Sequence, residues 1–179
     1  MNLRNKIVLI SRVFLHSGRK FMHIPVAIVV IFSFATHTRN SIFHDKIRLW
    51  EDTTRKSLNK TRPHYILGDA YYEAGRIDES LREFHTAVTI RPNDAQARFN
   101  RGSLFFKLGH LDDAIADFDI AIALNPSYIK AYNNRGAAFL KKRLYREALR
   151  DFDRVLALDP TNSFAIYNRR LVLTAMNDL

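Results

Sequence analysis

The sequence contains no cysteine, which excludes disulfides, thiol nucleophiles and cysteine metal sites. Glycine is also scarce, at 6 of 179 residues, and no glycine-rich loop of the phosphate-binding kind occurs. The 7 histidines show no HExxH or other metal-ligand spacing. These absences predict a non-enzymatic protein with no catalytic residues, no metal ligands and no cofactor. They allow an extracytoplasmic location without implying one.

Proline is scarce as well, but three of the 5 prolines are regularly placed. Pro92, Pro126 and Pro160 are 34 residues apart, and the last two end the similar stretches DDAIADFDIAIALNP and REALRDFDRVLALDP. Such a period is typical of a helix-turn-helix unit stacked on its own copies, because one unit cannot bury its apolar face alone. The predicted units are 61–94, 95–128 and 129–162, followed by a half unit, 163–179.

Each full unit alternates small and large residues at fixed positions. Glycine recurs in the first helix, at Gly68, Gly102 and Gly136. Phenylalanine recurs in the second helix, one turn after a small residue, at Phe84, Phe118 and Phe152. Small residues facing large ones allow two helices to pack closely. The pattern predicts an all-α chain with seven repeat helices.

Turn and capping residues also recur. Gly75 and Gly109 suit turns with positive φ, whereas Arg143 occupies the third turn and is less favourable there. The residues after the three prolines are predicted to cap the next helix, namely Asn93, Ser127 and Thr161. One acidic cluster is interpreted as solvated helix surface and helix-start charge: Asp112, Asp113, Asp117 and Asp119.

These units resemble tetratricopeptide repeats. The resemblance rests on L-G-x-x-Y at Leu67 to Tyr71, A-x-x-x-F at Ala114 to Phe118, and the closing prolines. It covers 61–179 and implies a right-handed superhelical α-solenoid with a concave groove lined by the first helices. The family's usual tryptophan is replaced by His64, Arg98 and Tyr132. In the half unit Arg170 takes the glycine position, which predicts a capping helix with no further repeat behind it.

The resemblance also implies which side chains line the groove. They are Tyr65, Asp69, Tyr72, Phe99, Asn100, Ser103, Phe106, Lys107, Lys130, Asn133, Asn134, Lys141, Tyr167 and Asn168. Aromatic rings can cover apolar side chains while amides bond a backbone, so the predicted partner is a protein or extended peptide segment. The alternative is that Asn100, Asn134 and Asn168 brace adjacent helices and the aromatics belong partly to the core.

Some tetratricopeptide proteins grip the C-terminal carboxylate of chaperones. Their clamp uses Lys and Asn in one unit, Asn in the next, and Lys and Arg in the third. The corresponding residues here are Tyr65, Asp69, Asn100, Lys130 and Asn134. Only Asn100 and Lys130 match, and Asp69 would repel an acidic tail, so a chaperone clamp is not predicted.

Most of the positive charge lies outside the repeats. Residues 1–59 contain 10 Lys and Arg against 3 acidic residues, whereas the whole chain carries a net charge of +10. Nucleic-acid binding by the repeats is therefore not predicted.

A basic segment, 1–20, precedes the apolar run IPVAIVVIFSFA at 24–35. Because a spanning helix needs about 20 residues, residues 21–38 are predicted to form a transmembrane helix or signal anchor. The flanking charges favour a cytoplasmic N-terminus, with the repeats outside the cytoplasm. One alternative is signal cleavage near Ala35, which would leave a periplasmic binding module. The other is a buried helix of a soluble domain.

Residues 39–60 carry a second resemblance. The stretch Arg39 to Asp52, RNSIFHDKIRLWED, resembles the junction in bacterial multi-pass mannosyltransferase-like membrane proteins, where R-N-x-x-W-x-D-x-x-x-L-W-E-D leads into tetratricopeptide repeats. Phe43 replaces the first tryptophan, and the multi-pass catalytic portion is not in this sequence. The apolar residues of the stretch predict a linker or docking helix that covers the open face of the first repeat. They are Ile42, Phe43, Ile47, Leu49 and Trp50. The alternative for Trp50 is a position at the membrane surface.

The sequence thus predicts a membrane-tethered scaffold or adaptor. The second hypothesis is that the chain is an accessory or truncated part of a membrane glycosyltransferase system, with a multi-pass membrane partner. The third is the secreted periplasmic module.

Overall fold

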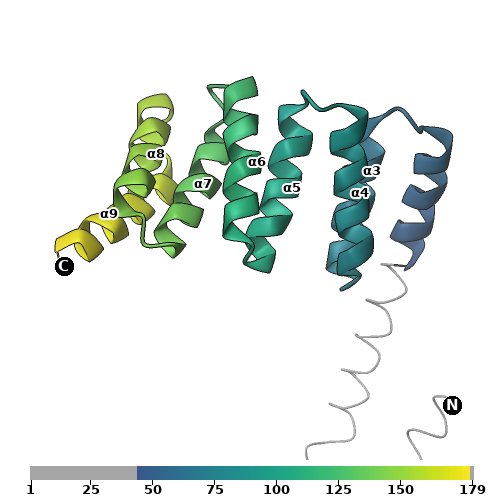
Figure 1. Ribbon diagram of the computed structural model, residues 1–179, viewed down its shortest axis with the longest axis horizontal. Coiled ribbons are helices and arrows are strands. Elements are labelled where there is room, and N and C mark those ends of the chain that lie inside the picture. The colour runs from purple at the N-terminus through teal and green to yellow at the C-terminus, as the bar shows by residue number, and fades with distance from the viewer. Residues whose placement is uncertain (1–43, 178–179) are drawn as a thin grey trace, which may run out of the picture. The chain divides into compact units, whose positions relative to one another are not determined.

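The computed structural model describes residues 44–177, and within that range all regular secondary structure is helical (Figure 1). The confirmed all-α solenoid begins with a helix over residues 44–56. Seven further helices follow: α3 (Thr61–Glu73), α4 (Ile77–Ile90), α5 (Ala95–Leu108), α6 (Leu111–Leu124), α7 (Ile129–Lys141), α8 (Tyr145–Leu158) and α9 (Ser163–Asn177). The basic segment 1–20 and the predicted transmembrane segment 21–38 lie outside the described residues. Between residues 44 and 177, the longest apolar stretch of any helix falls short of what a membrane crossing requires.

The helices pack in consecutive pairs, and each pair stacks on the next. α3 packs on α4, α5 on α6 and α7 on α8, while α4–α5, α6–α7 and α8–α9 contacts join the units (Figure 1). The close approach within a pair depends on the repeated glycine. A Cβ added to Gly136 would lie 2.9 Å from Cε1 of Phe152, and one added to Gly68 would lie 2.9 Å from Cε2 of Phe84. The phenylalanines are fully buried, so the predicted packing of small against large residues is confirmed.

The turns within the units use the left-handed backbone region. Gly75 and Gly109 have φ of 76° and 82°, and Arg143 is forced to φ 60° at the equivalent place. A side chain is disfavoured there because Cβ crowds the following carbonyl. The expectation that Arg143 is the less favourable turn residue is therefore confirmed.

Two of the predicted helix caps are wrong by one residue, and the third helix has no side-chain cap. Asp94, not Asn93, caps α5, and its Oδ1 accepts hydrogen bonds from the backbone N–H groups of Gln96 and Ala97. Asn162, not Thr161, accepts from the N–H of Ala165 in α9. No side chain caps α7, where Ser127 was expected. Each proline is the second residue of a four-residue turn, closed in one case by the N–H of Asp94 donating to the carbonyl of Arg91. The residue after the proline therefore lies inside the turn and is too early to cap.

The helix over residues 44–56 packs on α3. Ile47 is 3% exposed and forms a buried cluster with Leu67, Ala70 and Tyr71, and Trp50 packs against it. The Tyr71 hydroxyl donates to Glu51 at 2.7 Å. Leu49 is 62% exposed and does not join this contact, while Ile42 and Phe43 lie outside the described residues. This helix thus occupies the place that a second helix of a preceding unit would take.

Candidate peptide-binding groove

The residues expected to line a groove fall on the four first helices. α3 carries three of them, α5 five, α7 four and α9 two. These helices contact one another directly, through α3–α5, α5–α7 and α7–α9. One hydrogen bond shows the register: Nδ2 of Asn134 on α7 donates to Oγ of Ser103 on α5 at 3.3 Å. The expected residues therefore lie on first helices that adjoin one another across the repeats.

Two lysines on this surface lie over aromatic rings of the preceding repeat. Nζ of Lys107 is 4.5 Å from the ring centroid of Tyr72, and Nζ of Lys141 is 4.4 Å from that of Phe106. A cation over an exposed ring gains about 0.5–1 kcal/mol. Phe106 and Lys107 are consecutive on α5, so the two cation–ring pairs follow each other over three successive repeats. We call Tyr72, Lys107, Phe106 and Lys141 the lysine–aromatic row.

The asparagines are largely committed within the protein. Asn134 bonds Ser103 across two repeats, which fits the bracing interpretation. Asn100 accepts from Gln96 and Asn168 donates to the carbonyl of Phe164, both within their own helices. Nδ2 of Asn133 donates to Asn162 at 3.3 Å, while its buried Oδ1 has no partner. Fewer amides are thus available to a ligand than the sequence suggested.

The aromatic residues divide between core and surface. The Phe99 ring lies 5.9 Å from Phe118 and 5.0 Å from Tyr128, so it belongs partly to the core. Tyr167 is 63% exposed. Burial and the nearby Asp94 carboxylate raise the pKa of Tyr65 above its ordinary value. Tyr65, Tyr72 and Phe106 are half-buried, and Tyr167 is the most exposed ring of the expected set.

Tyr128 belongs to this surface but was not expected from the sequence. Its hydroxyl donates to Oε1 of Gln96 at 2.8 Å, and its pKa is raised to about 12, chiefly by burial and then by Asp94. Tyr128 precedes α7 in the connecting turn, so it falls outside the helix positions that the repeat pattern assigns to a groove.

Charge varies along the surface. Desolvation raises the pKa of the Asp69 carboxyl, although the nearby Lys107 opposes the effect. Lys130 and Lys141 on α7 are both exposed. The surface therefore carries mixed charge on the first repeat and positive charge on the third.

Comparison with known proteins agrees with this architecture. Residues 65–129 and 129–162 each match a tetratricopeptide repeat family model. The chain belongs to the tetratricopeptide repeat family. No curated protein sequence matches it. The family matches do not include residues 39–60, so the mannosyltransferase-like resemblance of that stretch remains a prediction.

Solved tetratricopeptide repeat structures show the same fold. The first such domain of Spaghetti (RPAP3), bound to the HSP90 peptide SRMEEVD, is 33% identical with a TM-score of 0.63, over 66% of this chain and 94% of that one. The second domain of human RPAP3, in complex with the HSP70 peptide SGPTIEEVD, is 25% identical with a TM-score of 0.57, over 63% and 97%. MamA has a TM-score of 0.69 at 20% identity, over 79% and 83%, and shows the fold alone.

Away from the groove, buried ion pairs join the two helices of a tetratricopeptide unit. Asp117 and Asp151 are only 3% and 4% exposed, so the interpretation of Asp117 as a solvated surface residue is wrong. Arg135 donates to both oxygens of Asp151, at 2.8 and 2.6 Å, and to Asp119 of the preceding unit. Burial lowers the pKa of Arg135, but the hydrogen bonds and charges of Asp151 and Asp119 outweigh it and raise the pKa. The sequence signal was the period itself, because both partners recur every 34 residues.

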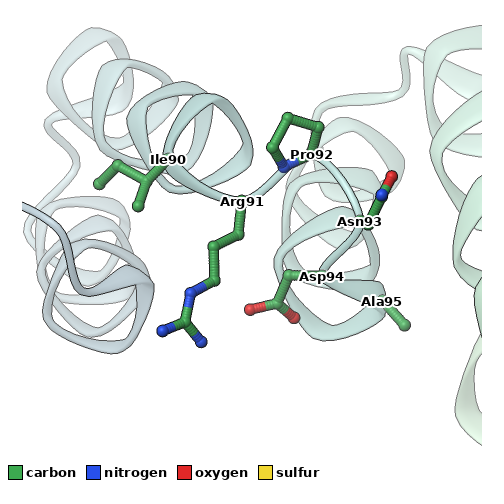
Figure 2. Close-up of a pocket in the computed structure, with 6 residues that line it drawn as sticks. All are labelled: Ile90, Arg91, Pro92, Asn93, Asp94 and Ala95. Atoms are coloured by element: carbon green, nitrogen blue, oxygen red, sulfur yellow. The ribbon is translucent and has the colours of Figure 1, made fainter.

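A shallow hollow of about 650 Å³ lies at the turn between α4 and α5, lined by residues 90–95 (Figure 2). Arg91 and Asp94 extend to the same side of this turn in Figure 2. The Asp94 carboxylate is already engaged, because it caps α5 and accepts a hydrogen bond from Thr61 at 3.1 Å. The hollow is thus part of the framework between repeats.

Proposed function

We propose that this chain is a non-catalytic scaffold that binds an extended peptide segment of a partner protein across α3, α5, α7 and α9. The lysine–aromatic row carries the proposal, because it places exposed lysines over half-buried rings on three successive repeats. Peptides bound by the two similar RPAP3 domains support the same use of the surface here. Rings can cover apolar side chains of a segment while the lysines meet its polar groups.

The test is selection of peptides from a displayed random library on the full-length chain in neutral detergent. The double variant Tyr72→Ala/Phe106→Ala should weaken binding of the selected peptides about tenfold, the equivalent of roughly 1.4 kcal/mol. The matched control is Leu124→Ala/Leu144→Ala, which removes exposed apolar side chains outside the row. Circular dichroism should show intact helices in both. Equal binding by the Tyr72/Phe106 variant and the wild type would refute the assignment to this surface.

The clamp positions argue against a chaperone C-terminus as the partner. Tyr65 and Asp69 stand where a clamp has Lys and Asn, and Asn134 stands where it has Arg. We expect the peptide SRMEEVD, which the similar Spaghetti domain binds, to bind more weakly here than selected peptides. Binding of equal strength, lost on removal of its terminal carboxylate, would contradict this expectation.

We also propose that residues 21–38 tether the repeats to a membrane, outside the cytoplasm. The apolar run 24–35 and its basic flanks support this. Carbonate washing of membranes from cells that express the tagged chain should leave full-length protein in the pellet. A soluble band shortened by about 35 residues would instead support cleavage near Ala35 and a periplasmic module.

The R-N…L-W-E-D stretch of 39–52 favours one second candidate, an accessory role in a membrane glycosyltransferase system. That role requires a multi-pass membrane partner that supplies the catalysis. Mild detergent extraction should then co-purify such a partner, and purification of the chain alone would remove the support.

A further inference from the structure

The ammonium groups of Lys107 and Lys141 are positioned by aromatic rings and not by a carboxylate of residues 44–177. Both are exposed, and neither takes part in an ion pair among residues 44–177. By contrast, Lys46 and Lys142 pair with Glu73 and Asp112. An aromatic face orients an ammonium group but leaves its charge and its other donors available. The two lysines are therefore preorganised cations with no ion-pair partner in the described part of the chain.

The surroundings of the two lysines differ by one carboxylate. Asp69 lies close enough to Lys107 for each charge to affect the other, although the two form no ion pair. One period later, Ser103 replaces that aspartate, and its hydroxyl accepts the hydrogen bond from Asn134. Lys141 thus has no equivalent of Asp69. An external carboxylate should be most favoured at Lys141 and also favoured, more weakly, at Lys107.

The repeat sets the spacing between the two cations. Packed helices lie about 8–10 Å apart, and both lysines occupy the same position on consecutive first helices. A polyproline II segment has three residues per turn and rises about 3.1 Å per residue, so its side chains recur on one side every ~9 Å. A β-strand would place side chains three apart on opposite faces. A polyproline II segment therefore matches one side chain to each repeat.

We infer that the lysine–aromatic row recognises an acidic segment in the polyproline II conformation, whose carboxylates recur every third residue and contact Lys107 and Lys141. This inference rests on the proposed peptide-binding function. It differs from a clamp on a chain terminus, because the recognised groups are internal side chains. The row's rings then cover the intervening residues of the segment.

The test uses three fluorescein-labelled peptides of equal length with blocked termini and the full-length chain. The first has Glu at every third position among Pro and Ala. The second has the same composition with its glutamates contiguous, and the third has Lys in place of Glu. Fluorescence anisotropy should show that the first peptide binds at least about fivefold more tightly than the second. The third should show no binding, and affinity for the first should fall as salt rises.

The decisive variant is Lys107→Glu/Lys141→Glu, matched by Arg82→Glu/Arg150→Glu, which makes the same charge change on exposed residues of α4 and α8. The lysine variant should lose about tenfold or more in affinity for the first peptide, because attraction becomes repulsion at both contacts. The control should stay within about twofold, since only long-range attraction changes. Unchanged helical circular dichroism of the lysine variant excludes unfolding as the cause.

Equal loss in the two variants would overturn the inference, because it would indicate nonspecific attraction. Equal affinity for the first and second peptides would overturn the proposed spacing, and failure of all three peptides would overturn acidic recognition. None of these results decides the proposed function, which depends on whether library-selected peptides require Tyr72 and Phe106. The two proposals can therefore fail separately.

Discussion

The Arg101 guanidinium holds both oxygens of the buried Asp117 carboxylate, with Nε and Nη2 at 2.7 and 2.8 Å. Asp117 is 3% exposed, so nearly all of its hydration is replaced by this contact and by Arg98. The pair joins α5 to α6 inside the second repeat. The same bond recurs between Arg135 and Asp151 in the third repeat.

Removal of the arginine should be costly. Arg101→Ala leaves the Asp117 carboxylate buried with only the longer contact to Arg98, and we expect a loss of about 3 kcal/mol in the free energy of unfolding. Urea denaturation followed by circular dichroism measures it. The control Arg82→Ala removes an exposed arginine that makes no ion pair in the described part of the chain, and it should change stability by less than about 0.5 kcal/mol. Similar losses in the two variants would show that Asp117 does not need its partner.

His85 occupies the position at which the next two units have an aspartate that pairs with an arginine of the following unit. Arg135 and Arg169 each bond an aspartate of the preceding unit, Asp119 or Asp153, whereas Arg101 meets His85 at 3.3 Å. His85→Asp should supply the missing carboxylate and stabilise the chain by about 0.5 kcal/mol, the value typical of an exposed pair. The gain should shrink in high salt. Thermal unfolding at two salt concentrations measures it, and a lower Tm at low salt would contradict the prediction.

A substitution in the turn of the third unit should also stabilise the fold. Arg143 is held at φ 60°, where its two equivalents are glycines. Arg143→Gly should raise the free energy of unfolding by about 1 kcal/mol, because the strain on Cβ is relieved. Gly109→Arg, the reverse change, should lower it by a similar amount. A loss of stability in Arg143→Gly would mean that the side chain contributes more than its backbone costs.

The packing of residues 44–56 on α3 should weaken as the pH rises into the alkaline range. Burial, followed by the hydrogen bond to Glu51, raises the pKa of Tyr71 to about 12, from an ordinary value of 10.0. Folding thus favours the neutral phenol, so its contribution to stability is complete below pH 10 and is lost as pH rises towards 12. Tyr71→Phe cannot ionise and should lose less stability between pH 9 and pH 11 than the wild type does. Denaturation curves at these pH values test this, and identical losses would contradict it.

The helices and turns within one repeat could be predicted from the sequence alone. Three features could be predicted because they belong to a unit that is repeated, so that one copy can be compared with the others. They are the 34-residue period, the packing of glycine against phenylalanine and the strained turn at Arg143. Side-chain size at fixed helical spacing determines how closely two successive helices pack, which is why the helix pairs could be predicted.

Only the tertiary structure decided which polar and charged side chains meet across neighbouring helices. Asp117 looks like any surface aspartate until α5 brings Arg101 and Arg98 onto it. Asn134 looks available until Ser103 takes its amide, and Lys107 and Lys141 become a row only when the preceding repeat places rings beneath them. These relationships join residues 16 to 35 positions apart, on different helices. The helix period determines which face a side chain occupies, but the stacking of one repeat on the next determines what that side chain meets.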